Sequence, residues 1–171
     1  EVAPLIKKLT GFNCVSDISL VHCPERVNPG DAFWTSENIP RVIGGMDVDG
    51  TRRAADFYST ILGGPVIDVR DVRDGLRPKF SLNSLGKLQS KNLPLGTVTM
   101  MRSIRDAEAV KAMENTVRDV NIAFVNELAK ISDVLGLDVV DIIDGMSTKP
   151  FGKGPYYPGV GVGGHCIAVD P

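Results

Sequence analysis

The sequence has no excess of basic charge, because its 19 Lys and Arg side chains are set against 21 Asp and Glu, for a formal net charge of −2. Nucleic-acid-binding domains usually carry a basic patch, so this balance argues against a nucleic-acid partner. The sequence also lacks an apolar run of about 20 residues, the length that crosses a bilayer, and it does not open with a signal peptide. We predict no nucleic-acid partner and no membrane association.

Cysteine and histidine are scarce as well. The three cysteines, Cys14, Cys23 and Cys166, are an odd number at spacings that match neither a disulfide framework nor a zinc site. Only two histidines are present, so no metal site is predicted. A few cysteines without a disulfide framework favour a reducing, cytoplasmic location.

Strands and helices are predicted to alternate along the first 69 residues. The predicted helices cover 1–9 and 51–62, and the predicted strands cover 18–23, 41–45 and 65–69. This alternation is typical of an α/β fold with a parallel sheet. Residues 74–98 break it with turn signals, lysines and arginines, and we interpret them as an exposed insertion. The sequence starts without Met inside the first helix and stops just after a glycine-rich loop, so both ends look cut.

The clearest pattern is a long amphipathic helix over residues 106–135, ended by Gly136. Its apolar side chains recur every three or four residues: Val110, Met113, Val117, Val120, Phe124, Leu128, Ile131 and Leu135. A stripe of this length is either core packing or the seam of a dimer. A shorter helix is predicted to follow, with Asp138 as its N-cap.

The long helix carries Lys111 and Asn115, which lie four residues apart and therefore share one face. An ammonium and an amide placed together stabilise a developing oxyanion. The same pair is also ordinary on a solvated helix face, so spacing alone leaves both interpretations open.

Two further residues are candidates for a functional site because each follows a loop or strand that commonly precedes one. Cys166 follows a glycine-rich loop and is either a nucleophile or a small buried apolar residue. Glu25 follows a predicted strand, where α/β sheets often place ligand sites. Solvated turn carboxylates are also common at such positions.

Four blocks occur in order along the chain: CPERVNPG (23–30), IPRVIGG (39–45), AEAVKAMENTVRDVNIAFVNELA (107–129) and TKPFGKGPYYPGVGVGGHCIAVDP (148–171). Together they resemble the UDP-glucose/GDP-mannose dehydrogenase family, and most of all its branch that oxidises UDP-N-acetylhexosamines such as UDP-N-acetylmannosamine. The blocks cover most of the chain outside the insertion.

The resemblance implies an α/β fold in which the C-terminal part of a Rossmann-like NAD-binding domain precedes a long helical dimerisation segment and a catalytic loop. The implied parts are an NAD-domain part over 1–73, an insertion with a connecting strand over 74–105, a helical dimerisation domain over 106–147 and a glycine-rich catalytic loop over 148–171. A homodimer through the 106–135 helix is expected. The glycine-rich NAD turn of the family would lie before residue 1, and its second α/β domain after residue 171.

The resemblance also implies an NAD-dependent, two-step oxidation of the C6 alcohol of a UDP-sugar to a carboxylate, without release of the aldehyde. Cys166 matches the nucleophile that captures the aldehyde as a thiohemiacetal, which is then oxidised to a thioester. Lys111 and Asn115 match the pair that stabilises the oxyanion. Glu25 matches the carboxylate that assists water or substrate deprotonation, and Asp170 matches an aspartate close to the cysteine.

Binding residues are carried over in the same way. Those implied to contact the substrate are Arg26, Val27, Tyr157, Gly161, Gly163 and Gly164. Those implied to contact NAD are Gly164 and Cys166. No metal ligand is implied.

The chain departs from the family pattern at two places. Ala168 stands where members that use glucose typically carry a lysine, which favours the hexosamine branch. The insertion over 74–98 is foreign to most relatives. Alternatives to the hexosamine reading are the same chemistry on UDP-glucose or GDP-mannose, and a non-catalytic dimerisation module derived from the family. A thiol-redox protein is disfavoured because no resolving cysteine lies near Cys166.

Overall fold

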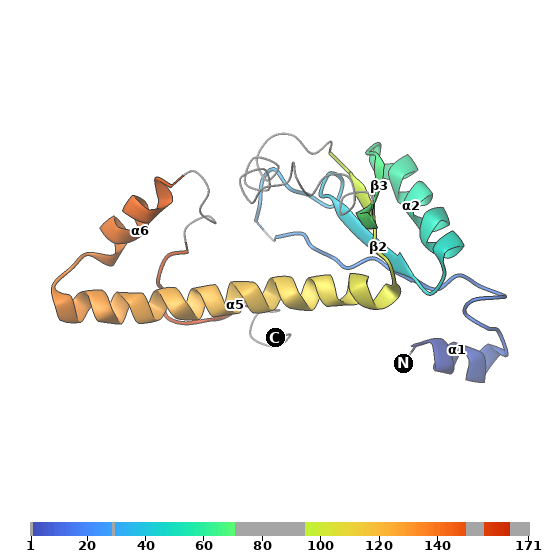
Figure 1. Ribbon diagram of the computed structural model, residues 1–171, viewed down its shortest axis with the longest axis horizontal. Helices are drawn as coiled ribbons and strands as arrows, with labels where there is room; N and C mark the ends of the chain where they lie inside the picture. The colour runs from blue at the N-terminus through green and yellow to red at the C-terminus, as the bar shows by residue number, and fades with distance from the viewer. Residues whose placement is uncertain (1, 29, 71–94, 150–155, 165–171) are drawn as a thin grey trace. The chain divides into compact units, whose positions relative to one another are not determined.

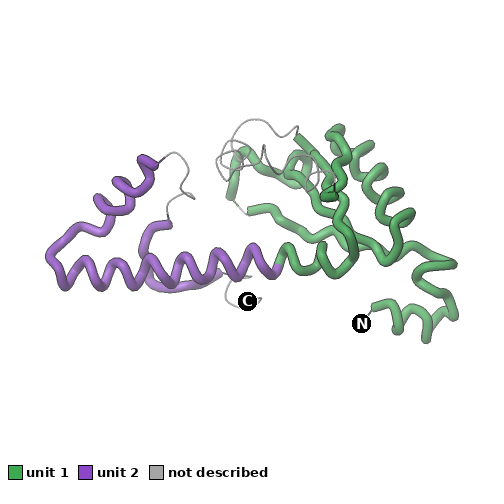
Figure 2. The backbone as a smooth tube through the Cα atoms, in the orientation of Figure 1, with its two compact units in different colours: residues 1–79, 92–111 green, residues 80–91, 112–171 purple. Residues whose placement is uncertain are grey.

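The computed structural model describes residues 2–28, 30–70, 95–149 and 156–164. It divides into two compact units (Figure 2), one made of residues 1–79 with 92–111 and the other of residues 80–91 with 112–171. The first unit holds the sheet. The second holds most of the long helix and the described part of the glycine-rich loop.

The sheet of the first unit has four strands in the order β1-β2-β4-β3. They are β1 (Val21–His22), β2 (Arg41–Gly45), β3 (Val66–Asp68) and β4 (Val98–Met100). β2, β4 and β3 run parallel, as predicted. β4 is the strand expected within 74–105, and it lies between β2 and β3 (Figure 1).

The prediction of a wholly parallel sheet is wrong at β1, which pairs with β2 in antiparallel register through Val21↔Gly45 and His22↔Gly44. A parallel pair needs a crossover connection, usually a helix, to return the chain to the same end of the sheet. The described residues between β1 and β2 contain no helix. The strand predicted over 18–23 is also shorter than expected and only half-buried.

The core of this unit forms where α2 (Val48–Leu62) packs on β2 and β4. Ile43, Ala55 and Val98 are fully buried there. The Asp47 side chain caps the start of α2 by accepting a hydrogen bond from the Gly50 N–H at 2.6 Å. α1 (Val2–Thr10) contributes no buried residue.

α5 (Ile104–Leu135) is a continuous helix of 32 residues, which confirms the long helix predicted from the sequence. It ends at Gly136, whose φ of 68° lies in the left-handed region, as expected for a helix stop. α6 (Val139–Ser147) follows, and the Asp138 carboxylate accepts from the N–H groups of Val140 and Asp141 as a predicted N-cap should.

The apolar stripe predicted on the long helix faces solvent in the single chain. Its exposed members are Met113, Val117, Val120, Phe124, Ile131 and Leu135. The side chains that α5 buries come from other positions: Ala107, Asn115, Val125 and Ser132. The stripe is therefore not core packing within the part of the chain that the structure describes.

None of the described helices combines the length and the apolar character required to cross a lipid bilayer. Most of the predicted insertion, namely residues 74–94, lies outside the described residues.

Candidate functional site

One face of α5 carries the predicted donor pair. Successive residues of an α-helix advance by about 100°, so Lys111, Asn115 and Asn126 fall within about 60° of one another. Asn115 is only 8% exposed, and a buried amide is held by hydrogen bonds in nearly all folded proteins. Phe124, nine residues after Asn115, points to the opposite side of the helix. The polar face and the apolar stripe are thus separate surfaces of one helix.

Glu25 lies just after β1, in the loop that leads to β2. One carboxylate oxygen, Oε1, accepts from the backbone N–H groups of Arg26 at 2.7 Å and Val27 at 2.8 Å. The other oxygen, Oε2, accepts from the Arg41 guanidinium at 3.2 Å. Glu25, Arg26 and Val27 are consecutive in the chain, and the last two supply the backbone N–H groups that bind the Glu25 carboxylate.

These contacts set the protonation of Glu25. The hydrogen bond from the Val27 N–H is the largest cause and holds the pKa of the Glu25 carboxyl below its ordinary value. Desolvation opposes it by a smaller amount, and the Arg41 guanidinium and the Arg26 N–H lower the pKa further. The Glu25 carboxylate is therefore ionised at neutral pH. A carboxylate with a lowered pKa is a weaker proton acceptor than a general base whose pKa lies near the operating pH.

Arg41 is the residue that positions the Glu25 carboxylate, and its guanidinium is mostly buried. A second nitrogen of the same guanidinium donates to the Ser36 carbonyl at 2.8 Å, which ties the loop between β1 and β2 to the start of β2. Arg41 stands in the IPRVIGG block, and its local sequence carries no sign of a partner 16 residues earlier.

The glycine-rich loop is described over residues 156–164, and it runs alongside α5 (Figure 1). Two side chains of the helical unit hold it. The Tyr157 hydroxyl donates to Asp144 Oδ1 on α6 at 2.6 Å, and the Gly159 N–H donates to Asn126 Oδ1 on α5 at 2.9 Å. Neither Asn126 nor Asp144 was singled out from the sequence, because an Asn or Asp on a helix carries no local signal of a distant loop partner.

The loop glycines differ in what they do. Gly161 and Gly164 have φ values of 136° and 107°, which side-chain-bearing residues rarely adopt. Gly163 has no such requirement, and like the other two it has no atom within 4 Å of the position that a Cβ would occupy. The backbone from Gly161 to Gly164 therefore leaves room for a ligand to approach closely.

Cys166 and Asp170 lie outside the described residues, so their place in the predicted site stays a prediction. The other two cysteines are free thiols in unreactive settings. Cys14 is 4% exposed, and burial raises the pKa of the Cys23 thiol despite the nearby Arg41 guanidinium. The described residues hold no group of three or more His, Cys, Asp or Glu side chains suited to a metal ion.

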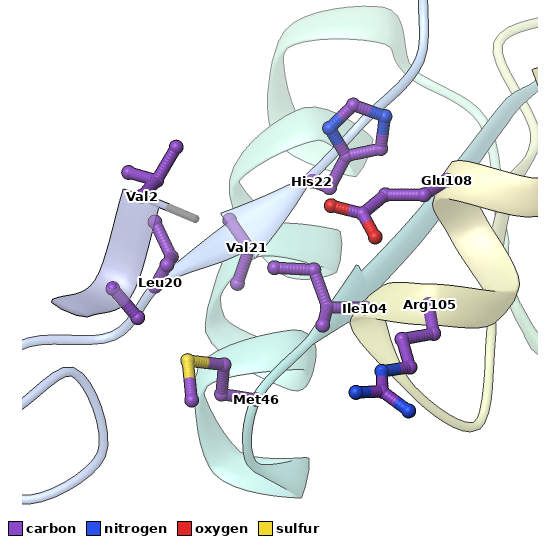
Figure 3. Close-up of a pocket in the computed structure, with 9 residues that line it drawn as sticks. Val2, Leu20, Val21, His22, Met46, Ile104, Arg105 and Glu108 are labelled. Atoms are coloured by element: carbon purple, nitrogen blue, oxygen red, sulfur yellow. The ribbon is translucent and has the colours of Figure 1, made fainter. Parts of the chain in front are cut away.

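A cleft of about 620 Å³ lies elsewhere, in the first unit (Figure 3). Val2, Leu20, Met46 and Ile104 contribute apolar walls, and the polar side chains come from His22, Arg105 and Glu108. None of the predicted site residues lines this cleft.

The described part of the chain is thus an α/β protein with a four-stranded mixed sheet and a long helix that carries the polar face. Residues 105–171 match the UDP-glucose/GDP-mannose dehydrogenase family, central domain. The chain belongs to the UDP-glucose/GDP-mannose dehydrogenase family, whose dehydrogenases use NAD.

Individual relatives agree with this assignment. The chain is 34% identical to Protein CapL of Staphylococcus aureus over all 171 residues, which are 32% of CapL. It is 32% identical to the UDP-N-acetyl-D-mannosamine dehydrogenase of Pyrococcus horikoshii over 171 residues, 100% of this chain and 33% of that protein. The solved structure of the UDP-D-ManNAc dehydrogenase from that organism superposes with a TM-score of 0.70 at 31% identity, over 98% of this chain and 32% of the other. The chain thus spans about a third of the length of the curated relatives it matches.

Proposed function

We propose that these residues belong to an NAD-dependent nucleotide-sugar 6-dehydrogenase, which converts the C6 alcohol of a UDP-N-acetylhexosamine to the uronate. The substrate that we favour is UDP-N-acetylmannosamine. The observation that carries the proposal is the polar face of α5. It presents Lys111 and the buried Asn115, and the glycine loop is bound to Asn126 on that same face. Family membership gives this arrangement its chemical meaning.

The proposed reaction has two oxidations separated by a covalent step. The alcohol loses a hydride and a proton to give the aldehyde, and the Cys166 thiolate then adds to the aldehyde carbon to form a thiohemiacetal. Loss of a second hydride gives the thioester. Water cleaves the C–S bond, releasing the uronate and the thiol. Bound NAD would supply the oxidising power as the hydride acceptor, and the balance would then be one alcohol and one water to one carboxylate, two NADH and three protons.

Lys111 and Asn115 act on the negative oxygen that develops when the thiolate or water adds to the carbonyl carbon. The ammonium and the amide donate hydrogen bonds to it, and placement on one rigid helix fixes their geometry before the reaction starts. Glu25 assists deprotonation of water or substrate. Because its pKa is lowered, it does so mainly by accepting a hydrogen bond and orienting the water. Asp170 supports the cysteine.

The substrate-binding role belongs to two loops. Arg26 and Val27 lie in the first of them, and Tyr157, Gly161, Gly163 and Gly164 lie in the second. The open space beside Gly164 fits the close approach of a flat nicotinamide ring, with Cys166 as the second proposed NAD contact. The two described strand-to-helix junctions, β2 to α2 and β4 to α5, lack the G-x-G-x-x-G spacing that binds a pyrophosphate. We therefore assign no pyrophosphate contact to them.

We also propose a homodimer that buries the exposed stripe of α5. Six large apolar side chains on one side of a single helix exceed the scattered exposure that is normal at a protein surface. A two-fold dimer covers the stripe of each copy with that of the other.

The same stripe supports a second candidate, a dimerisation module without catalytic activity. Alkylation of the cysteines separates the two candidates. In the catalytic protein, Cys166 reacts with iodoacetamide faster than Cys14, which is buried, and Cys23, whose thiol pKa is raised. UDP-N-acetylmannosamine with NAD slows the Cys166 reaction. Equal rates at all three thiols, without protection by substrate, contradict the catalytic proposal and favour the module.

Ala168 favours a hexosamine over glucose, and the choice of UDP-N-acetylmannosamine among the hexosamines rests on the relatives. These include a solved NDP-N-acetyl-D-galactosaminuronic acid dehydrogenase from Methanosarcina mazei Go1, with a TM-score of 0.67 at 29% identity over 98% of this chain and 29% of that one. Comparing NADH formation with UDP-N-acetylmannosamine, UDP-N-acetylgalactosamine, UDP-glucose and GDP-mannose tests the assignment. The proposal predicts the highest kcat/KM for UDP-N-acetylmannosamine, and a preference for UDP-glucose or GDP-mannose contradicts it.

A further inference from the structure

We propose that Asn126 and Asp144 are positioning residues that hold the glycine loop, residues 157–164, against α5 and α6. The loop leads directly to Cys166 in the sequence. The catalytic consequence is that these two residues fix the position of the chain just before the nucleophile Cys166, and this part rests on the proposed function. The structural part of the inference stands on two hydrogen bonds and on the sparse packing of the loop.

The loop has little packing to fix it. Gly159, Gly161, Gly163 and Gly164 each have no atom within 4 Å of the position of a Cβ, and the Val160 side chain is fully exposed. Glycines also lose more conformational freedom on ordering than any other residue. A segment of this composition needs specific polar contacts to adopt one conformation.

Asn126 supplies one such contact from the interior of α5. The donor is the Gly159 backbone N–H, so the side chain must present its oxygen as the acceptor. Asparagine on a helix often bonds to its own backbone, as Asn121 does to the Val117 carbonyl. The Asn126 oxygen instead accepts a hydrogen bond from a residue 33 positions away in the sequence.

Asp144 supplies the second contact from α6. It accepts from the Tyr157 hydroxyl at 2.6 Å, a length typical of a hydrogen bond to an ionised acceptor. The same bond raises the pKa of the Tyr157 hydroxyl, so the tyrosine remains a donor at neutral pH. The two contacts lie two residues apart in the loop and attach it to two different helices.

The test compares variants that differ in the acceptor alone, made in the full-length protein. Asn126→Ala removes the acceptor, whereas Asn126→Asp keeps an oxygen at the same place. Asn121→Ala is the matched control, since it makes the same change in helix propensity within α5 but affects only a bond inside the helix. On α6, Asp144→Ala removes the acceptor and Asp144→Asn keeps an oxygen at the same place. Asp141→Ala, at an exposed position of the same helix, is the control.

Amide hydrogen exchange of the peptide that covers 157–164 is the primary measurement, because it does not depend on activity. We expect exchange in this peptide to rise about 2- to 10-fold in Asn126→Ala and Asp144→Ala, the effect of losing one hydrogen bond. Asn126→Asp, Asp144→Asn and both controls should retain wild-type exchange. Unchanged exchange in both Ala variants overturns the inference, as does an equal rise in the controls.

Kinetics and alkylation then test the catalytic consequence. We expect the two Ala variants to lower kcat for uronate formation, with rescue by Asn126→Asp and Asp144→Asn, and to change the alkylation rate of Cys166. Combining Asp144→Ala with Tyr157→Phe should give no more loss of loop protection than either single change, because both break one bond. If exchange rises as expected while Cys166→Ala keeps wild-type activity, the loop assignment stands and the proposed function fails.

Discussion

The exposed stripe of α5 makes a quantitative prediction about assembly, with Phe124→Ala as the perturbation. Phe124 is 58% exposed in the single chain and lies near the middle of the stripe. Complete burial of a Phe side chain contributes about 1.5–3 kcal/mol, so burying the exposed share contributes about 1–1.7 kcal/mol. A two-fold dimer contains this side chain twice. The substitution should therefore cost about 2–3.5 kcal/mol of association free energy.

That loss corresponds to a dimer Kd weakened by about 30- to 300-fold, since each 1.4 kcal/mol is a factor of ten. Sedimentation equilibrium across a concentration series measures it directly. Phe57→Ala is the matched control, because Phe57 is 62% exposed but belongs to α2 and not to α5. It should leave the Kd unchanged. A Phe124→Ala variant that dimerises within twofold of the wild type refutes the reasoning, and so does an equal loss in both variants.

Three further predictions concern the fold and the Glu25 loop. Arg41→Met should raise the pKa of Glu25 toward its ordinary value in a carbon-13 NMR titration, while the Val27 N–H keeps part of the lowering; an unmoved pKa contradicts the ion pair. Because this pKa is lowered in the folded state, the stability it contributes is present above the unfolded pKa. It is lost as pH falls through the folded one. Gly44→Ala should destabilise by about 3 kcal/mol in urea denaturation, since a Cβ there would lie 2.1 Å from the Ser103 carbonyl oxygen, and a change below about 0.5 kcal/mol refutes that contact. Asp138→Ala should cost about 1 kcal/mol as a lost N-cap, and unaltered thermal unfolding would show that the cap is dispensable.

The parts of the fold that could be predicted are those with strong local signals. The long helix, its stop at Gly136 and the Asp138 cap follow from periodicity and end residues, and each is present in the structure. The direction of β1 could not be predicted in this way. Whether a strand returns parallel or antiparallel depends on the path of the connection, and residues 24–40 carry no periodic pattern that reveals it.

The candidate site likewise has features that local sequence signals predict and features that only the folded structure shows. Spacing placed Lys111 and Asn115 on one face and the apolar stripe on the other, but only the structure shows that Asn115 is buried and that the stripe is exposed. The hydrogen bonds from Arg41 to Glu25 and from the Gly159 N–H to Asn126 join residues 16 and 33 positions apart, so no local sequence pattern indicates them. Tertiary packing, rather than propensity, selects these partners.

The measurement that tests the central claim most directly is the stoichiometry of oxidation by the full-length protein, run with wild type and Cys166→Ala. With UDP-N-acetylmannosamine and NAD, the account predicts two NADH for each uronate and, after acid quench, a covalent sugar adduct on Cys166 detected by mass spectrometry. Cys166→Ala should form no adduct, and it should form uronate much more slowly than the wild type. Uronate formation at the wild-type rate by Cys166→Ala, or one NADH per sugar with free aldehyde as the product, would contradict the account.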